Sequence, residues 1–265
     1  MRIAIVIPAR YASTRYPGKP LIQLKGANGL AKPLIQRSWE AAKAVPGDMK
    51  VIVATDDERI AQVARNFGAE VMMTPSACRN GTERCAAVLP ALKGIDFVVN
   101  LQGDAPLTPP KFVSALVEVM AADQEIVMAT PALRTTSGVY SRLLEDQRAG
   151  RVGGTTVVIG SNGNALYFSK SVIPHAPVGW TSGPSAPCLL HVGVYIYRPT
   201  ALEKYVALSP SPLEELEGLE QLRFLEHGVP VRVVELAQPD YDLWELNNPV
   251  DVPAVEAALS RSGLD

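Results

Sequence analysis

The stretch IAIVIPAR, residues 3–10, decides the fold class, and the loop PARYASTRYPGKP, residues 8–20, follows from it. A short, continuous, β-branched apolar run is typical of a strand buried on both faces of a parallel sheet. In an open α/β sheet, ligands bind at the carboxyl ends of the strands, where this loop must emerge. The loop carries Arg10, Arg15 and Lys19. It is therefore the first candidate for a binding site.

Expected strands and helices alternate over the first hundred residues. Apolar runs that predict strands are separated by stretches with apolar residues at helical spacing, which indicates an α/β unit with right-handed crossovers. The expected strands are 51–54 and 97–101, and the expected helices are 33–44, 59–67 and 82–92.

Beyond an expected helix at 111–120 the rhythm changes to short strands with Gly, Ser and Pro between them, and 174–188 is a proline-rich loop. We predict an α/β fold with a mixed, mostly parallel sheet flanked by helices and an inserted arm. The expected single domain, 1–265, has a nucleotide-binding half (1–125), an acceptor-binding and dimerisation arm (about 126–215) and a closing segment (216–265). The later expected elements are strands at 126–133, 155–159, 165–168, 190–197 and 231–236 and a last helix at 253–260.

Composition excludes several classes of function. The 265 residues are 47% hydrophobic, with 25 Lys+Arg against 27 Asp+Glu, so nothing favours binding to nucleic acid or to an anionic membrane. Three cysteines make no disulfide framework and no zinc motif. Without a long apolar run we expect a cytoplasmic, soluble protein. A Rossmann dehydrogenase is disfavoured because no GxGxxG follows the first strand.

Two strand ends carry residues suited to phosphate chemistry. The cations of the 8–20 loop, with its hydroxyls and Gly18, suit a polyphosphate, although a solvated basic loop has the same composition. The stretch 100–104 places Asp104 after a strand, where its carboxylate could hold Mg²⁺ against phosphate oxygens. An Asp that caps the next segment is the alternative, and Gly103 would let the backbone approach a nucleotide.

Three other places carry polar residues with two interpretations each. The stretch 80–84 predicts a helix N-terminus whose amides could meet a base or phosphate. Glu220 and Gln221 lie on an expected helix, where a solvated face is the more frequent outcome. His191 opens a strand-like run, and a hydrogen-bonded structural histidine is more frequent there than a catalytic base.

The residues together resemble a family. The stretches IPARYASTRYPGKPL, VATDDERIA, NGTERCAAV, NLQGDAP, ALYFSKSVIP, HVGVYIYR and SPSPLEELEGLEQLRFL resemble the cytidylyltransferases that activate 3-deoxy-manno-octulosonate (Kdo), in order from about residue 3 to 260. The resemblance implies a glycosyltransferase-A-like fold, CTP and an acidic sugar as substrates, Mg²⁺, a homodimer and a part in making lipopolysaccharide precursors. It implies catalytic roles for Arg10, Arg15, Lys19 and Asp104. It implies nucleotide binding by Pro8, Ala9, Arg10, Asn80, Gly81, Arg84 and Gln102. It implies acceptor binding by Gln102, His191, Tyr195, Glu220 and Gln221, and metal binding by Asp104 and Asn247.

The chain departs from the family pattern at four places. Asn247 stands where the motif VDTPED has a metal-binding Asp, and an amide is a weaker Mg²⁺ ligand than a carboxylate. Ala105 replaces the second acid of the motif QGDEP. The motif QSGTER reads RNGTER here, with Arg79 as an added cation. Thr156 aligns with a lysine that belongs to the acceptor side in the family.

These departures leave alternatives open. Changed charges in one site change which acceptor is accepted, so a modified ulosonic acid or a phosphonate is an alternative to Kdo. A degenerate homologue that binds a nucleotide without turnover is the alternative from another class. A sialic-acid-type synthetase is close, but STRYPGK and LEQLR fit the Kdo branch better.

Overall fold

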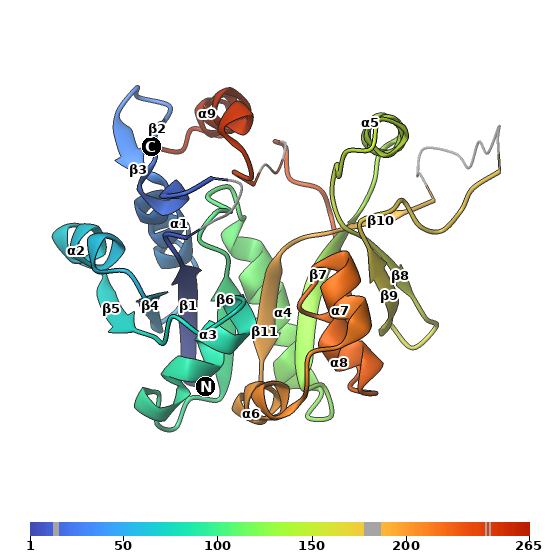
Figure 1. The fold of residues 1–265 in the computed structure, drawn as a ribbon, viewed down its shortest axis with the longest axis horizontal. Coiled ribbons are helices and arrows are strands. Elements are labelled where there is room, and N and C mark those ends of the chain that lie inside the picture. Colours follow the sequence, from blue (N-terminus) through green and yellow to red (C-terminus); the bar gives the residue numbers. More distant parts are fainter. Residues whose placement is uncertain (13–15, 178–186, 242, 244) are drawn as a thin grey trace.

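The computed structural model describes residues 1–12, 16–177, 187–241, 243 and 245–265. Its centre is a sheet of ten strands in the order β5-β4-β1-β6-β11-β7-β10-β8-β9, with β12 paired to β7 (Figure 1). The strands are β1 (Ile3–Ala9), β4 (Met49–Thr55), β5 (Glu70–Met73), β6 (Phe97–Leu101), β7 (Met128–Arg134), β8 (Thr156–Ile159), β9 (Ala165–Ser169), β10 (Leu189–His191), β11 (Val194–Tyr197) and β12 (Arg232–Leu236).

The sheet is mixed, as the sequence predicts. The four strands β5, β4, β1 and β6 are parallel to one another, whereas β11, β7, β10, β8 and β9 pair antiparallel. Strand β12 adds one more parallel pair beside β7. Because β6 pairs directly with β11, one continuous sheet joins the first hundred residues to the later ones.

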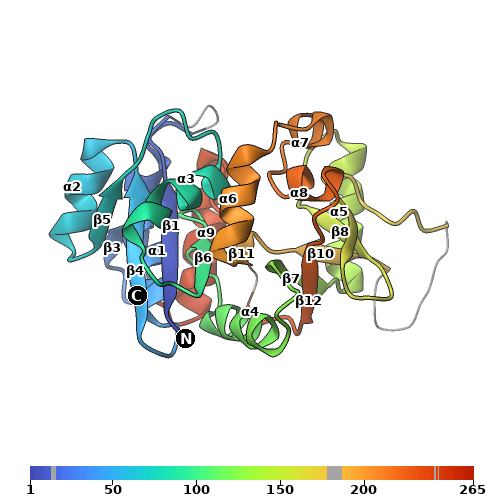
Figure 2. The same ribbon diagram turned by 90° about the horizontal axis from the view of Figure 1, so that it is seen from below.

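Helices cover both faces of this sheet (Figure 2). Odd-numbered side chains of β1, such as Ile5, pack on one face and even-numbered ones, such as Val6, on the other. The first face is covered by α1 (Leu34–Lys43), α2 (Glu58–Asn66) and α4 (Pro110–Ala122), and the second by α3 (Gly81–Val88), α6 (Pro199–Ala207), α7 (Pro212–Glu217) and α8 (Leu222–Glu226). Helix α5 (Ser137–Arg148) lies beside the far strands (Figure 1).

Two predicted elements are interrupted. The expected strand 190–197 is two strands, because the amide of Val194 donates to the carbonyl of Val192 at 2.7 Å and so leaves the ladder. The expected helix 82–92 ends at Val88 and continues as a 3-10 turn, Leu89–Ala91, because Pro90 has no N–H to donate.

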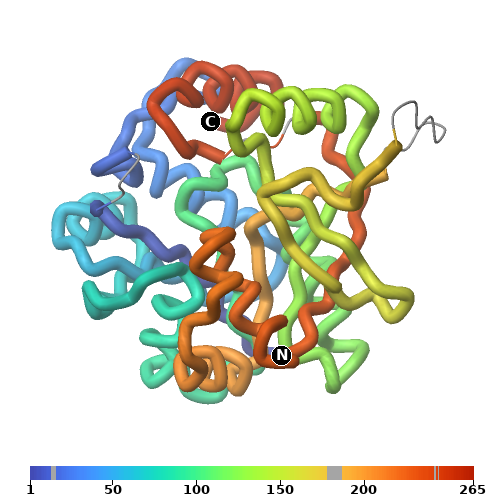
Figure 3. Tube along the Cα trace, turned by 45° about the vertical axis from the view of Figure 1, so that its right-hand side comes forward, coloured from blue at the N-terminus to red at the C-terminus, as the bar shows by residue number. Residues whose placement is uncertain are grey.

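Some elements were not predicted at all. Strand β5 and helix α5 are missing from the prediction, as is the hairpin of β2 (Gln23–Lys25) and β3 (Ala31–Pro33). This hairpin packs against the last helix, α9 (Val252–Arg261), through a small apolar cluster of its own. The C-terminal helix therefore lies beside residues 23–33, whereas the N-terminus and the C-terminus lie far apart (Figure 3). The expected loop 174–188 falls largely on residues 178–186, outside the described ranges.

Candidate active site

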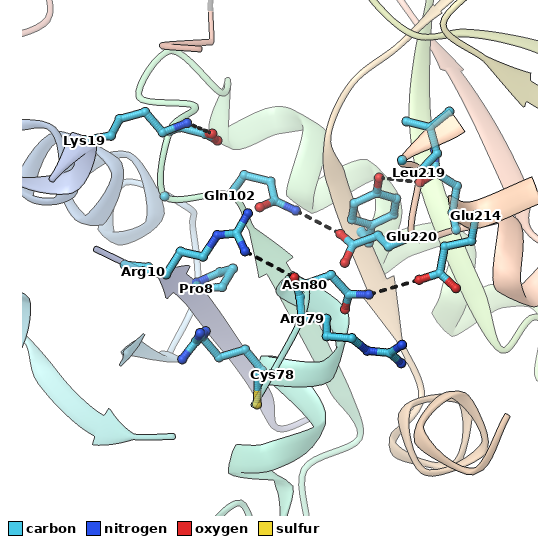
Figure 4. A pocket seen from close by; sticks show the side chains of 18 of the residues that line it. Pro8, Arg10, Lys19, Cys78, Arg79, Asn80, Gln102, Glu214, Leu219 and Glu220 are labelled. Atoms are coloured by element: carbon cyan, nitrogen blue, oxygen red, sulfur yellow. Dashed lines mark hydrogen bonds and ion pairs between the residues drawn. The ribbon is translucent and has the colours of Figure 1, made fainter. Parts of the chain in front are cut away.

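A cavity of about 560 Å³ opens where β1 and β6 end and where α3 begins. Figure 4 shows side chains from both halves of the sequence pointing into it. Its lining includes most of the residues that the sequence singles out: Pro8, Ala9, Arg10, Lys19, Asn80, Gly81, Arg84, Gln102, Asp104, Tyr195, Glu220 and Gln221, together with Pro20, Cys78, Arg79, Gly103, Pro210, Glu214, Glu215, Gly218 and Leu219.

The floor of the cavity depends on glycine. A Cβ on Gly103 would lie 2.7 Å from the carbonyl oxygen of Pro8, so the strand ends of β1 and β6 approach each other only because this position has no side chain. The hydroxyl of Ser38 donates to the Gly103 carbonyl at 3.0 Å and fixes the same turn from α1. A Cβ on Gly81 would lie 3.0 Å from the side-chain nitrogen of Asn100 and 3.2 Å from that of Gln102.

The end of the cavity nearest the N-terminal loop carries cations. The Lys19 ammonium lies 2.5 Å from a carboxylate oxygen of Asp104, and the two side chains are only 12% and 26% exposed. Gly18, with φ at +70°, makes the turn that brings Lys19 there. The exposed Arg10 donates to the carbonyl of Arg79 at 3.4 Å. Lys19 of the loop and Asp104 thus lie together at this end of the cavity.

Helix α3 begins at the middle of the cavity wall. Asn80 caps it, because its Oδ1 accepts the amide N–H of Glu83 at 2.9 Å. The free amide of Thr82 donates to Glu220 Oε2 at 2.8 Å. A carboxylate therefore sits on the positive end of this helix.

Glu220 joins the two sides of the cavity. Its second oxygen accepts from the side chain of Gln102 at 3.2 Å (Figure 4). Burial raises the pKa of the Glu220 carboxyl, although the hydrogen bonds from Thr82 and Gln102 oppose that shift. The sequence left Glu220 between a solvated face and a ligand, and the structure places it inside the cavity.

Gln221 has an unsatisfied donor. Its side chain is 1% exposed and lines the cavity, its Oε1 accepts the Tyr195 hydroxyl at 3.2 Å, and its Nε2 has no hydrogen-bond partner among the described residues. A buried N–H without a partner costs free energy, so a ligand oxygen at this position would be stabilised.

Arg84, in α3, is a buried cation in the lining of the cavity. It is 2% exposed, donates to the hydroxyl of Thr74 and lies 3.5 Å from a carboxylate oxygen of Asp56. These contacts hold the guanidinium in place at the base of α3. The neighbouring Cys78 is half-buried, and burial raises the pKa of its thiol, which therefore stays protonated at neutral pH.

His191 lies behind the cavity. Its ring packs against Phe168 and Tyr195, its Nε2 is 2.8 Å from the hydroxyl of Thr130, and burial lowers its pKa to about 3. It is not among the described residues that line the cavity. These contacts favour the structural alternative for His191, and a part in acceptor binding stays a prediction.

The expected second metal residue lies in a segment next to Asp104. The amide of Leu246 donates to the Asp104 carbonyl at 3.0 Å. Asn247 is the next residue after Leu246, so its backbone lies near Asp104. The carboxylate of Asp251 accepts the amides of Asn247 and Asn248 at 3.0 and 2.6 Å. Asp251 is therefore engaged in a local turn. The predicted residue Arg15 lies outside the described residues.

Sequence reasoning missed an ion-pair cluster beside the cavity. Arg223, 1% exposed, donates to Glu214 at 2.6 and 2.7 Å and to Glu83 at 3.2 Å. Tyr205 donates to Glu214 at 3.1 Å. The sequence shows only that Arg223 stands among the leucines of SPSPLEELEGLEQLRFL. This pattern does not show which carboxylates the arginine meets.

Comparisons with known proteins show the family of the chain. Residues 4–234 match the family model described as cytidylyltransferase, so the chain belongs to the cytidylyltransferase family. Within the described residues, no helix is long and apolar enough to cross a membrane.

Relatives that are similar over nearly the whole chain show which members of the family it resembles. A 3-deoxy-manno-octulosonate cytidylyltransferase of Maricaulis maris is 43% identical, covering 99% of both chains. A mitochondrial enzyme of that name from Arabidopsis thaliana is 39% identical, covering 99% of this chain and 85% of its own. A solved CMP:2-keto-3-deoxy-manno-octonic acid synthetase complexed with CTP has a TM-score of 0.82 at 34% identity, covering 99% and 100%. Within its family the chain is one of the 3-deoxy-manno-octulosonate cytidylyltransferases.

Proposed function

We propose that this protein transfers CMP from CTP to the anomeric hydroxyl of Kdo and releases pyrophosphate. The observation that carries the proposal is one cavity with Arg10 and Lys19 at one end and Glu220 and Gln221 at the other. A nucleoside triphosphate and a polyhydroxylated acid can bind together in such a cavity. The relatives named above, similar over nearly the whole chain, carry the substrate names.

The N-terminal end of the cavity suits the triphosphate. Among the described residues Arg10 donates to one backbone carbonyl, and its remaining donors can meet phosphate oxygens. Lys19 adds a second charge from the same loop. Cytidine then lies against Pro8, Ala9 and the start of α3, and catalysis consists mostly of positioning and charge neutralisation. Gly81, Arg84 and Gln102 complete that wall.

The residues present fit Mg²⁺ bound together with phosphate. Asp104 offers a carboxylate at the triphosphate end, and no group of three His, Cys, Asp or Glu residues forms a closed cage in the described ranges. Mg²⁺ is usually held by one or two carboxylates plus substrate phosphates, which matches this donor set. When bound, the ion neutralises phosphate charge. Asp104 would hold it, with Asn247 as the second oxygen donor.

The opposite end of the cavity suits the acceptor. The unpartnered Nε2 of Gln221 donates to an acceptor oxygen, while Tyr195 holds the other end of the same amide in place. Glu220 accepts hydrogen bonds from hydroxyl groups of the acceptor with the lone pairs that Thr82 and Gln102 leave open.

Pyrophosphate release with CTP and Mg²⁺, measured across Kdo, other 3-deoxy acid sugars, sialic acids and small phosphonates, tests the proposal. Saturable turnover that is fastest with Kdo supports it. Turnover with another acid alone moves the specificity to that acid. CTP binding without any turnover makes the chain a nucleotide-binding homologue.

One observation favours the second candidate, an acid other than Kdo. Thr156, which replaces a lysine expected on the acceptor side, is 1% exposed, and its hydroxyl donates to the carbonyl of Ser171 at 2.7 Å. The position thus serves the local backbone and supplies no charge to an acceptor carboxylate. The same acid panel separates the two candidates.

A homodimeric assembly and a place in the cytoplasm are further parts of the proposal. A homodimer formed through the arm at 126–215 would cover exposed apolar side chains such as Val152 and Leu166. Light scattering of the purified chain measures its mass directly. A monomer at micromolar concentration would contradict this part.

A further inference from the structure

Asn80 uses both ends of its side-chain amide within the protein. Its Oδ1 accepts the Glu83 N–H at 2.9 Å and so caps α3. Its Nδ2 donates to the Tyr205 hydroxyl at 2.8 Å and to Glu214 Oε1 at 3.3 Å (Figure 4). The cap belongs to the nucleotide side of the cavity, whereas both partners of Nδ2 belong to the acceptor side.

The partners of Nδ2 connect Asn80 to the residues expected to hold the acceptor. Tyr205, on α6, donates to Glu214 at 3.1 Å and lies 3.3 Å from the backbone carbonyl of Glu220. Glu220 in turn accepts the N–H of Thr82, two residues after Asn80. The short segment 220–221 is thus held from two positions at the beginning of α3.

A buried ion pair closes this set of contacts into a ring. Arg223 bridges Glu214 and Glu83, and Glu83 is the residue whose amide Asn80 caps. Arg223 and Tyr205 are at most 1% exposed and Glu214 is 9% exposed. A fully hydrogen-bonded polar network of this kind holds one geometry, because any displaced member leaves a buried polar group without a partner.

We propose that Asn80 is a positioning residue that sets the placement of Glu220 and Gln221 relative to the nucleotide wall. The inference rests on the proposed function. It differs from the expectation that Asn80 contacts the nucleotide, since it predicts that the Nδ2 contact governs use of the acceptor and leaves the affinity for CTP unchanged.

The variant Asn80→Ser separates the two ends of the side chain. Serine is an equally good helix cap, so α3 keeps its first turn, but serine cannot reach Tyr205 and Glu214. We expect kcat/KM for the acceptor to fall about three- to tenfold, the effect of one hydrogen bond. The Kd of CTP, measured by calorimetry without acceptor, should stay within about twofold, because that side of the cavity is unaltered.

A double-mutant cycle with Tyr205→Phe shows whether Asn80 acts through Tyr205. We expect the loss in the variant that combines Asn80→Ser with Tyr205→Phe to be smaller than the sum of the two single losses, because both substitutions remove the hydrogen bond between Asn80 and Tyr205. Additive losses would overturn the proposal, as would a Kd for CTP that rises as much as the acceptor effect, or an Asn80→Ser variant with unaltered acceptor kinetics.

A readout without any acceptor keeps this test apart from the proposed function. Hydrogen exchange of the segment 212–222 should be faster in Asn80→Ser than in the unaltered protein, while exchange in α5 stays the same. Unchanged exchange at 212–222 contradicts the positioning role. Faster exchange in a protein that shows no turnover with any acid would leave the positioning role standing and reject the proposed function alone.

Discussion

At the scale of single residues, Asp104 carries the most weight. Its carboxylate is paired with Lys19 at the proposed triphosphate end of the cavity, and it is the proposed Mg²⁺ ligand. We expect Asp104→Ala to abolish measurable turnover at any practical Mg²⁺ concentration while CTP still binds. Initial rates over a Mg²⁺ titration, with the exposed Asp48→Ala as control, measure this. Turnover restored by added Mg²⁺ would show that Asp104 is not essential.

Asn247 tests the second metal position. We expect Asn247→Asp to lower the Mg²⁺ concentration needed for half-maximal rate, because a carboxylate adds a charge that the amide lacks. The Mg²⁺ dependence of the initial rate is the measurement. An unchanged Mg²⁺ dependence would mean that residue 247 does not face the ion.

Glu220 makes a prediction about pH. Its folded-state pKa is raised by burial, so its ionised form opposes folding at neutral pH, and this penalty disappears as pH falls through the raised pKa towards the ordinary value. We expect Glu220→Gln to be more stable than the unaltered protein at pH 7, with the difference shrinking towards pH 5. Thermal unfolding over this pH range measures it, and a difference that grows on acidification contradicts it.

At the scale of elements, the sequence predicts the strands and helices that pack on apolar faces. Strands β1, β4 and β6 and helices α1, α2 and α4 were predicted because their patterns are continuous or have a clear helical period. Strands β2 and β3 have three residues each, and α5 buries only Leu143 in its helix. Their apolar patterns are too short or too weak for such a prediction.

The candidate site was predicted only in part, for a similar reason. Loop residues such as Arg10 and Asp104 follow strand ends, and strand ends meet at one edge of the sheet. The partners of Glu214 and Arg223 cannot be predicted in this way, because they depend on how α3, α6, α7 and α8 pack together. His191 shows the converse, since its place in a strand did not show which way its ring points.

The turn after β6 tests how the elements form the cavity floor. We expect Gly103→Ala to lower the free energy of unfolding by about 1–3 kcal/mol and to weaken CTP binding, because its Cβ would collide with the carbonyl of Pro8. The matched control is Gly138→Ala in α5, where a Cβ meets nothing nearer than 4.0 Å. Denaturant unfolding compares the two. Equal stability of both variants would contradict the close approach.

At the scale of the whole molecule, one sheet carries both halves of the cavity. The parallel strands β1 and β6 place the cationic loop and Asp104, and β11, paired with β6, places Tyr195 beside Gln221. Helix α3, through Gly81 and Arg84, and helix α7, through Glu214 and Glu215, then line the cavity as well. The fold thus brings the proposed triphosphate end and the proposed acceptor end to opposite sides of one cavity.

The central claim is that this cavity transfers CMP from CTP to an acid sugar. The most direct measurement is ³¹P NMR of the purified protein with CTP, Mg²⁺ and Kdo. We predict one new phosphodiester signal and one equivalent of pyrophosphate, both dependent on Kdo. Formation of free CMP and pyrophosphate without a phosphodiester, or an unchanged CTP spectrum, would contradict the claim.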